Sequence, residues 1–239
     1  LPSDQADFGM RTWDADGSEA ETCGNGIRCL ARYVLEKGLA SGEREEMTIE
    51  TVAALNRITF EREGGRISGF IVNMSKPRFS ETEIPFRRLN GADDLTRHGP
   101  MLTYTAEVCG HSLDLNLVSM GNPHAVMFLD RPVAQFPMEV IGPVVERLPV
   151  FPERVNFEVA RVLDDNRIEA RVWERGVGET KACGSGACAI TIASATLGYT
   201  TKDVTVHLPG GVLRASYNGS GDVVLAGPAE IIYEGTWPE

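Results

Sequence analysis

The stretch E-T-K-A-C-G-S-G-A-C-A-I-T-I-A-S-A-T-L at Glu179–Leu197 occurs in a second version earlier in the chain. The earlier copy is E-A-E-T-C-G-N-G-I-R-C-L-A-R-Y-V-L-E-K at Glu19–Lys37. One offset of 160 positions, the distance from Cys23 to Cys183, relates the two copies without a gap. Each copy is typical of a Cys-Gly-x-Gly turn that opens a helix, with a glycine where the helix should stop. The duplication predicts two related lobes.

The Cys-Gly-x-Gly turn has a definite chemistry. Glycines let the backbone bend sharply and approach a ligand closely. The first turn of the following helix offers unpaired N–H groups and the positive end of the helix dipole, which suit a carboxylate. A cysteine at a helix start is expected to favour its thiolate, with a pKa lowered from about 8.5 into the range of roughly 3.5–7.5. Two such turns facing each other across a pseudo-twofold axis would hold two thiols on opposite sides of one anion site.

The composition excludes several classes of protein. The chain has 239 residues, 42% hydrophobic and 24% charged, which is ordinary for a globular protein. A net charge of −11 and a pI near 4.9 argue against nucleic acid or an anionic membrane as a partner. No apolar run approaches the ~20 residues of a membrane span, and no signal peptide is recognisable. Five cysteines without a dense framework indicate a reduced, cytoplasmic protein.

Short strands are predicted nearly everywhere outside the two helices, with a short or broken helix at Met138–Leu148, where Pro143 interrupts the pattern. The predicted strands are Phe8–Trp13, Met47–Val52, Arg57–Arg62, Arg66–Met74, Tyr104–Cys109, Ser112–Met120, His124–Phe128, Arg154–Leu163, Arg167–Glu174, Val204–Leu208, Val212–Tyr217, Val223–Ala226 and Ile231–Thr236. Leu1–Asp4 has no initiator methionine and leads directly into the first strand, so the chain is expected to begin partway through a domain.

This pattern predicts an α+β fold of two pseudo-symmetric lobes. Each lobe is expected to be a curled, mostly antiparallel, barrel-like sheet around a central helix. We place the first lobe at residues 1–83 and the second at residues 84–228.

The five cysteines differ in their expected roles. Cys109, Cys29 and Cys188 are expected to be small buried hydrophobic residues, the usual state of a free cysteine. Cys23 and Cys183 are expected to be reactive, because both stand at the same glycine-flanked helix start. A zinc site is disfavoured: at ~100° per residue, each helix turns its second cysteine far from its first, so four sulfurs cannot converge.

Two further motifs are candidates for the same cleft. Gly121-Asn122-Pro123-His124 reads either as a functional loop or as a simple turn between strands. Trp173-Glu174-Arg175-Gly176 reads either as part of the site or as a surface ion pair, and it lies just before the second cysteine turn. No dinucleotide fingerprint, P-loop or H-E-x-x-H motif is present, so no nucleotide or catalytic metal is indicated.

Two thiols, an anion cradle and no cofactor suit the inversion of an α-carbon. Inversion removes a proton from one face of that carbon and returns a proton to the other face. One thiolate can act as the base and the opposing thiol as the acid, with the roles exchanged in the reverse direction. The helix N–H groups would stabilise the carboxylate as it gains enolate character.

These motifs resemble those of diaminopimelate epimerase over essentially the whole chain. The matching segments are Asp14–Glu21, Cys23–Cys29, Gly121–His124, Val155–Phe157 and Glu174–Ala189. The resemblance implies an isomerase without pyridoxal phosphate or any other cofactor, which interconverts LL- and meso-diaminopimelate and forms a homodimer. It also implies that a C-terminal strand, residues 229–239, returns to the first lobe.

The resemblance assigns roles to particular residues. It implies that Cys23 and Cys183 are the acid/base pair and that His124 and Glu174 tune them. It implies a cradle for the α-carboxylate and a set of substrate contacts: Gly24, Asn25, Gly184 and Ser185 for the former, and Asp14, Asn122, Asn156, Glu174 and Arg175 for the latter. Arg175 suits the distal carboxylate.

Two departures from the family pattern stand out. The family's N-terminal segment with a G-N-D-F motif, which supplies a substrate-binding Asn, is absent from this sequence. Asp14 stands where the family usually has Asn, and an ionised Asp can only accept hydrogen bonds, so Asp14 is expected to weaken binding of the distal carboxylate.

Two other functions stay open at this point. One is a racemase or epimerase of another amino acid, such as proline, using the same thiols. The other is a redox-sensing binding protein in which Cys23 and Cys183 form a regulatory disulfide.

Overall fold

The two cysteine turns each open a helix of the same length. A computed structural model describes residues 1–13, 17, 19–20, 23–52, 54–89 and 95–236. Helix α1 spans Gly24–Glu36 and helix α3 spans Gly184–Thr196, so their bounds differ by the same 160 positions as the sequence copies. Both helices end alike, at Gly38 and Gly198 with φ of 66° and 74°, a backbone region that glycine adopts without strain. The duplicated helices are confirmed.

A large mixed sheet accounts for most of the remaining chain. Within the described residues it has 14 strands. Its main path runs β1-β4-β5-β6-β16-β15-β14-β12-β11-β10-β9-β8-β7, with β13 on β12. The strands are β1 Phe8–Gly9, β4 Glu46–Glu50, β5 Leu55–Glu63, β6 Arg66–Asn73, β7 Leu95–His98, β8 Met101–Val108, β9 His111–Ser119, β10 Pro123–Phe128, β11 Asn156–Asp164, β12 Arg167–Glu174, β13 Gly178–Thr180, β14 Asp203–Leu208, β15 Gly211–Ser216 and β16 Val224–Gly227, while β2 Thr12–Trp13 pairs with β3 Glu19–Ala20. The remaining helices are α2 Met138–Glu146, with Pro143 inside it, and a 3₁₀ turn at Val133–Gln135.

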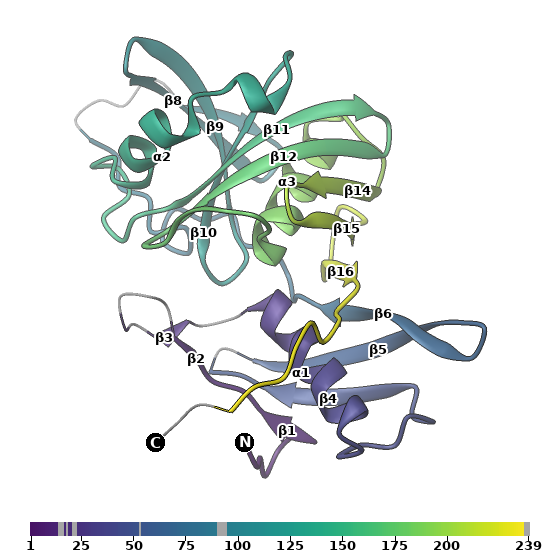
Figure 1. Cartoon of the computed structure of the whole chain (residues 1–239). Coiled ribbons are helices and arrows are strands. Elements are labelled where there is room, and N and C mark those ends of the chain that lie inside the picture. Colours follow the sequence, from purple (N-terminus) through teal and green to yellow (C-terminus); the bar gives the residue numbers. More distant parts are fainter. Residues whose placement is uncertain (14–16, 18, 21–22, 53, 90–94, 237–239) are drawn as a thin grey trace.

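The strands divide into two lobes that repeat one arrangement (Figure 1). In the first lobe, β1 pairs in parallel with β4, the strand that follows α1. In the second, β12 pairs in parallel with β14, the strand that follows α3. Most other neighbours are antiparallel, and the sheet curls without closing, so the α+β fold of two pseudo-symmetric lobes is confirmed. The lobe boundary at residue 83 stays a prediction.

The two helices are buried to different extents. On α1 only one face is buried, formed by Gly24, Ile27, Arg28, Ala31 and Val34. On α3 every residue from 184 to 194 is buried, because strands of the second lobe surround it. None of the described helices is long and apolar enough to cross a membrane.

Strand β16 joins the two lobes into one sheet. It pairs with β15 on one side and with β6 on the other, both antiparallel. Its Leu225 is fully buried and lies against both helix starts. A Cβ added to Gly24 would lie 3.2 Å from Leu225 Cδ2, and one added to Gly184 would lie 3.0 Å from the same atom. The junction therefore tolerates only glycine at these two positions without movement of Leu225.

Three sequence predictions are wrong. The strand predicted at Ile231–Thr236 does not form, since residues 228–236 have no strand pairing among the described residues. The segment still lies against α1 of the first lobe, where Arg32 Nε donates to Ala229 O at 2.8 Å and Lys37 Nζ contacts Glu234 Oε1. Cys29 is exposed, because it lies on the side of α1 away from the buried face. Cys109 is also exposed, at a hairpin turn with φ of 51°. The burial predicted for Cys188 is confirmed.

The contact of Gly184 with Leu225 gives a testable prediction. Gly184→Ala is expected to lower the free energy of unfolding by about 1–3 kcal/mol, since the new methyl overpacks the junction. The same change in a Leu225→Ala background is expected to cost less, because the clashing atom is gone. Gly42→Ala is the control, as its Cβ would meet no atom within 4 Å. Urea denaturation measures the unaltered protein and the four variants, including Leu225→Ala alone, and equal costs in both backgrounds would contradict the assigned contact.

Candidate active site

The first turns of α1 and α3 meet at the junction of the lobes. A Cβ on Gly184 would lie 3.6 Å from Gly24 Cα and 3.5 Å from Asn25 Oδ1. Asn25 Nδ2 donates to Ala182 O at 3.0 Å, directly before the second cysteine. Arg28 fixes Asn25 in turn, through a bond from Nη2 to Asn25 Oδ1 at 2.8 Å. Both helix dipoles therefore direct their positive ends toward one region.

Cys23 caps the first of these helices. Its Sγ accepts a hydrogen bond from Gly26 N at 3.3 Å, and the side chain is half-buried. Burial raises the pKa of the Cys23 thiol, an effect that outweighs the lowering by the Gly26 N–H, and the charge of Glu174 raises it further. The expected lowering of this pKa is wrong.

Cys183 occupies the equivalent position before α3 and is more deeply buried, with 5% of its surface exposed. Its Sγ lies 3.5 Å from Ser185 Oγ. Burial raises the pKa of the Cys183 thiol well above its usual value, with added contributions from the charges of Glu174 and Glu158. Desolvation again exceeds the effect of the helix dipole, because the thiolate loses its water and faces two carboxylates.

His124 lies at the end of a buried polar chain. Its Nδ1 is 2.7 Å from Glu158 Oε1, and both side chains are fully buried. Its Nε2 is 3.0 Å from Asn122 Oδ1, and Asn122 Nδ2 donates to Ser185 Oγ at 3.4 Å. Glu158 on β11, His124 on β10, Asn122 in the turn before β10 and Ser185 on α3 thus form one chain that leads to Cys183.

Glu174 stands at the end of β12, near both thiols, since its charge acts on the pKa of each. Thr180 Oγ1 donates to Glu174 Oε1 and fixes its orientation. Arg175 follows on the turn, where its backbone N–H donates to Asn156 Oδ1 at 2.9 Å and its Nη1 donates to Glu153 O at 3.3 Å. Asn156 Nδ2 donates to Pro123 O at 2.9 Å, so this amide holds the strand carrying His124 against the turn carrying Arg175.

The predicted residues therefore gather around one region, with Asp14 alone lying outside the described residues. Sequence reasoning missed two buried glutamates. Glu158 follows Asn156 by two residues and so shares its side of β11, a period-two signal that was available in the sequence. Glu146 on α2 accepts from Trp173 Nε1 at 2.7 Å and Gly176 N at 3.1 Å, and it positions the turn after β12.

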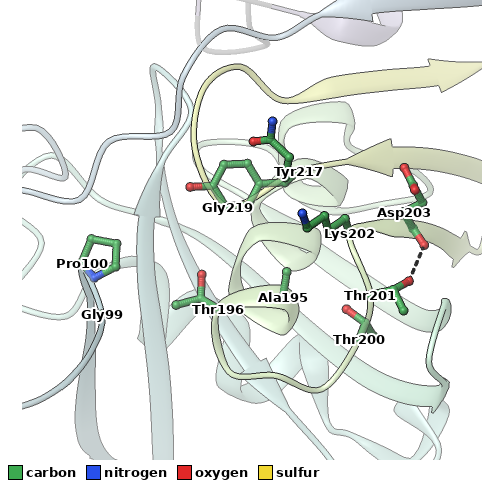
Figure 2. A pocket seen from close by; sticks show the side chains of 11 residues that line it. Gly99, Pro100, Ala195, Thr196, Thr200, Thr201, Lys202, Asp203, Tyr217 and Gly219 are labelled. Atoms are coloured by element: carbon green, nitrogen blue, oxygen red, sulfur yellow. Dashed lines mark hydrogen bonds between the residues drawn. The ribbon is translucent and has the colours of Figure 1, made fainter.

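A separate surface pocket lies at the other end of α3 (Figure 2). It has a volume of about 780 Å³ and is lined by Ala195, Thr196, Lys202 and Tyr217 among others. Ala195 lies eleven positions after Gly184 on the same helix, which corresponds to roughly 16 Å along the axis. This pocket contains none of the predicted site residues.

Comparison with known proteins gives the family. The sequence profile described as diaminopimelate epimerase matches residues 1–80 and 116–232. A diaminopimelate epimerase of Moorella thermoacetica is 44% identical over 239 residues, which is 100% of this chain and 82% of the relative. The chain belongs to the diaminopimelate epimerase family. It is therefore an isomerase of the amino-acid epimerase class.

Other relatives and solved structures agree with this family and its fold. The diaminopimelate epimerase of Bacillus subtilis is 40% identical over 238 residues, covering 99% of this chain and 80% of the relative. A hydroxyproline epimerase structure from Agrobacterium vitis has a TM-score of 0.65 at 16% identity, over 95% of this chain and 70% of the other. A PhzF-family phenazine biosynthesis protein from Bacillus anthracis has a TM-score of 0.61 at 17% identity, over 95% and 79% of the two chains. At these identities the two structures support the fold alone.

The raised thiol pKa values predict an order of chemical modification. At pH 7.5, iodoacetamide is expected to alkylate exposed Cys29 and Cys109 before Cys183, because only the thiolate reacts. The rate at Cys183 is expected to keep rising as the pH passes about 8.5, the usual thiol pKa. Cys188 serves as the slow reference, since burial raises its pKa to about 12.

Peptide mapping by mass spectrometry measures each cysteine separately in the same sample. A rate at Cys183 that levels off below pH 8 would show that its pKa is lowered, contrary to this prediction.

Proposed function

We propose that this protein interconverts LL- and meso-diaminopimelate by a two-base mechanism that uses no cofactor. The single observation that carries the proposal is the meeting of the two duplicated helix starts, each preceded by a cysteine. The names of the curated relatives supply the substrate.

Cys23 and Cys183 act as the acid/base pair. One thiolate removes the α-proton and the other thiol returns a proton to the opposite face, so the configuration inverts. The N–H groups of Gly24, Asn25, Gly184 and Ser185 bind the α-carboxylate and stabilise its enolate character in the transition state. No electron acceptor is required, because these groups spread the charge that develops at the α-carbon.

The substrate also changes the charge balance of the site. Both thiols are neutral near pH 7 without ligand, since burial and Glu174 raise the pKa of each. An α-ammonium group bound near Glu174 neutralises that carboxylate and lowers the pKa of the neighbouring thiol. Formation of the reactive thiolate is thereby coupled to binding of an amino acid.

The remaining roles follow the family pattern. His124 and Glu174 tune the two thiols, while Asn122, Asn156, Glu174 and Arg175 contact substrate, Arg175 at the distal carboxylate. Asp14, which lies outside the described residues, is proposed to weaken binding of the distal carboxylate. We also propose a cytoplasmic homodimer that binds neither nucleic acid nor membrane.

The alternatives make different predictions. A racemase of another amino acid, such as proline, would use the same thiols but would not require a distal carboxylate. A redox-sensing binding protein would form a Cys23–Cys183 disulfide and would catalyse no exchange at an α-carbon. Incubation with diaminopimelate in D₂O under reducing conditions separates them, since only an epimerase of this substrate incorporates α-deuterium.

Removal of either thiol tests the two-base mechanism. Cys23→Ser and Cys183→Ser are each expected to lower kcat by at least about 10³-fold, because each thiol serves one face of the α-carbon. Cys29→Ser is the matched control. Cys29 is exposed on α1, the helix that follows Cys23, so this substitution is expected to leave kcat unchanged.

Chiral chromatography of the two stereoisomers measures the rate, and circular dichroism checks the fold of each variant. Substantial turnover by either folded Cys23 or Cys183 variant would exclude the mechanism.

A further inference from the structure

The buried carboxyl of Glu158 has no part in the reaction described above, and its surroundings are unusual. Its Oε1 contacts His124 Nδ1 at 2.7 Å, while its Oε2 is buried and has no hydrogen-bond partner among the described residues. A Cβ added to Gly186 would lie 2.9 Å from Oε1 and 3.5 Å from Cys183 Sγ. Glycine in the first turn of α3 is therefore what allows this carboxyl to lie beside the second cysteine.

The hydrogen bonds of His124 define where its protons lie. Asn122 Oδ1 can only accept, so the facing Nε2 of His124 carries a proton. One further proton lies between Nδ1 and Glu158 Oε1, since a bare nitrogen facing a bare carboxylate would be repulsive. The pair is then neutral overall, whether that proton is on the ring or on the carboxyl. A neutral pair suits this fully buried position, where burial raises the pKa of Glu158.

From Nε2 onward, every hydrogen bond has the same direction. His124 Nε2–H donates to Asn122 Oδ1, and Asn122 Nδ2 donates to Ser185 Oγ. Because Ser185 Oγ accepts a hydrogen bond from Asn122, its own hydroxyl proton can be donated to Cys183 Sγ, which lies 3.5 Å away. The chain thus ends in a donor that stabilises a thiolate at Cys183.

We propose that Glu158 is a positioning residue for Cys183: by holding His124 as an Nε2–H donor, it orients Asn122 and Ser185 to donate toward the Cys183 sulfur. Without a partner at Nδ1, a neutral imidazole carries its proton on either nitrogen. When Nε2 is bare, Asn122 turns its amide N–H toward it, and Asn122 Oδ1 then accepts the Ser185 hydroxyl proton. The donor at the sulfur is lost in that arrangement. Glu158 therefore selects one of two directions for the whole chain.

Other charged and titratable groups near Cys183 do not perform this selection. Glu174 at the end of β12 raises the pKa of both thiols, and its carboxylate accepts a hydrogen bond from Thr180 Oγ1. Arg28 on α1 donates to Asn25 Oδ1, Gly24 O and Pro228 O. Cys23 lies before α1, where its sulfur accepts from Gly26 N.

The test compares Glu158→Leu and Glu158→Gln with the unaltered protein. Imidazole ¹⁵N NMR is expected to show His124 protonated at Nε2 in the unaltered protein and as a mixture of both tautomers in Glu158→Leu. Removal of the Glu158 charge alone would lower the pKa of Cys183, but the hydrogen bond from Ser185 is the larger effect on this thiol. Alkylation of Cys183 is therefore expected to shift to higher pH and to slow roughly 10- to 100-fold at pH 8, the effect of one hydrogen bond to a charged group. The alkylation of Cys23 is expected to be unaffected. The amide of Glu158→Gln can donate to a bare Nδ1 or accept from a protonated one, so this variant is expected to give a His124 spectrum and a Cys183 profile between those of the unaltered protein and Glu158→Leu.

Thr103→Val is the matched control. Thr103 is buried in the same sheet, and its Oγ1 donates to Asn116 Oδ1 at 2.8 Å, away from both cysteines. It is expected to change stability without changing the His124 spectrum or the Cys183 profile. Neither readout requires substrate, so a failure of this proposal is distinguishable from a failure of the diaminopimelate assignment, on which the link to catalysis rests.

Two outcomes would overturn the proposal. One is an unchanged His124 tautomer in Glu158→Leu. The other is an unchanged Cys183 profile together with a lower kcat, which would indicate a purely structural role. If Glu158→Leu does not fold, Glu158→Gln decides: a spectrum identical to that of the unaltered protein overturns the proposal, and a mixture of tautomers supports it.

Discussion

The close approach of two helix starts is the constraint on which the rest of this structure depends. Gly24 and Gly184 lie together beneath Leu225, at distances that leave no room for a side chain on either residue. Because the helices meet end to end, the cysteines that precede them lie at the same junction. The strands of each lobe then serve mainly to hold its helix in place. Other features of the site, including the amide of Asn25 and the chain ending at Ser185, are extensions of this contact.

The duplicated segment made the main features of the fold predictable from sequence. Glycine spacing, apolar runs and turn residues located both long helices and nearly all of the long strands, because these signals are local. The prediction of a C-terminal strand was wrong because a strand needs a partner with free backbone groups, and no described strand pairs with residues 228–236. The predicted burial of Cys29 was wrong because it depends on how much of α1 the sheet covers, and the periodicity of one helix does not determine this.

The site was predictable in its composition but not in its energetics. The sequence identified the thiols and their position at helix starts, from which a lowered pKa was expected. The pKa values are instead raised, because the thiols are buried and lie near carboxylates: Glu174 for Cys23, and Glu174 and Glu158 for Cys183. The approach of these side chains to the sulfurs depends on tertiary structure. The two thiols also differ in their neighbours. Gly26 faces Met10 where Gly186 faces Glu158, so a thioether stands beside one turn and a carboxyl beside the other.

Strand β16 also has a consequence for the order in which the chain folds during synthesis. It is formed by Val224–Gly227, yet four of its residue pairings are with β6, at Phe70–Asn73. At about 5–20 residues per second, the ribosome needs roughly 8–30 s to make the intervening segment. Throughout that interval the edge of β6 has no partner, and such an edge can pair with other chains. During synthesis, the first lobe is thus expected to need chaperones most in the period before strand β16 has emerged from the ribosome.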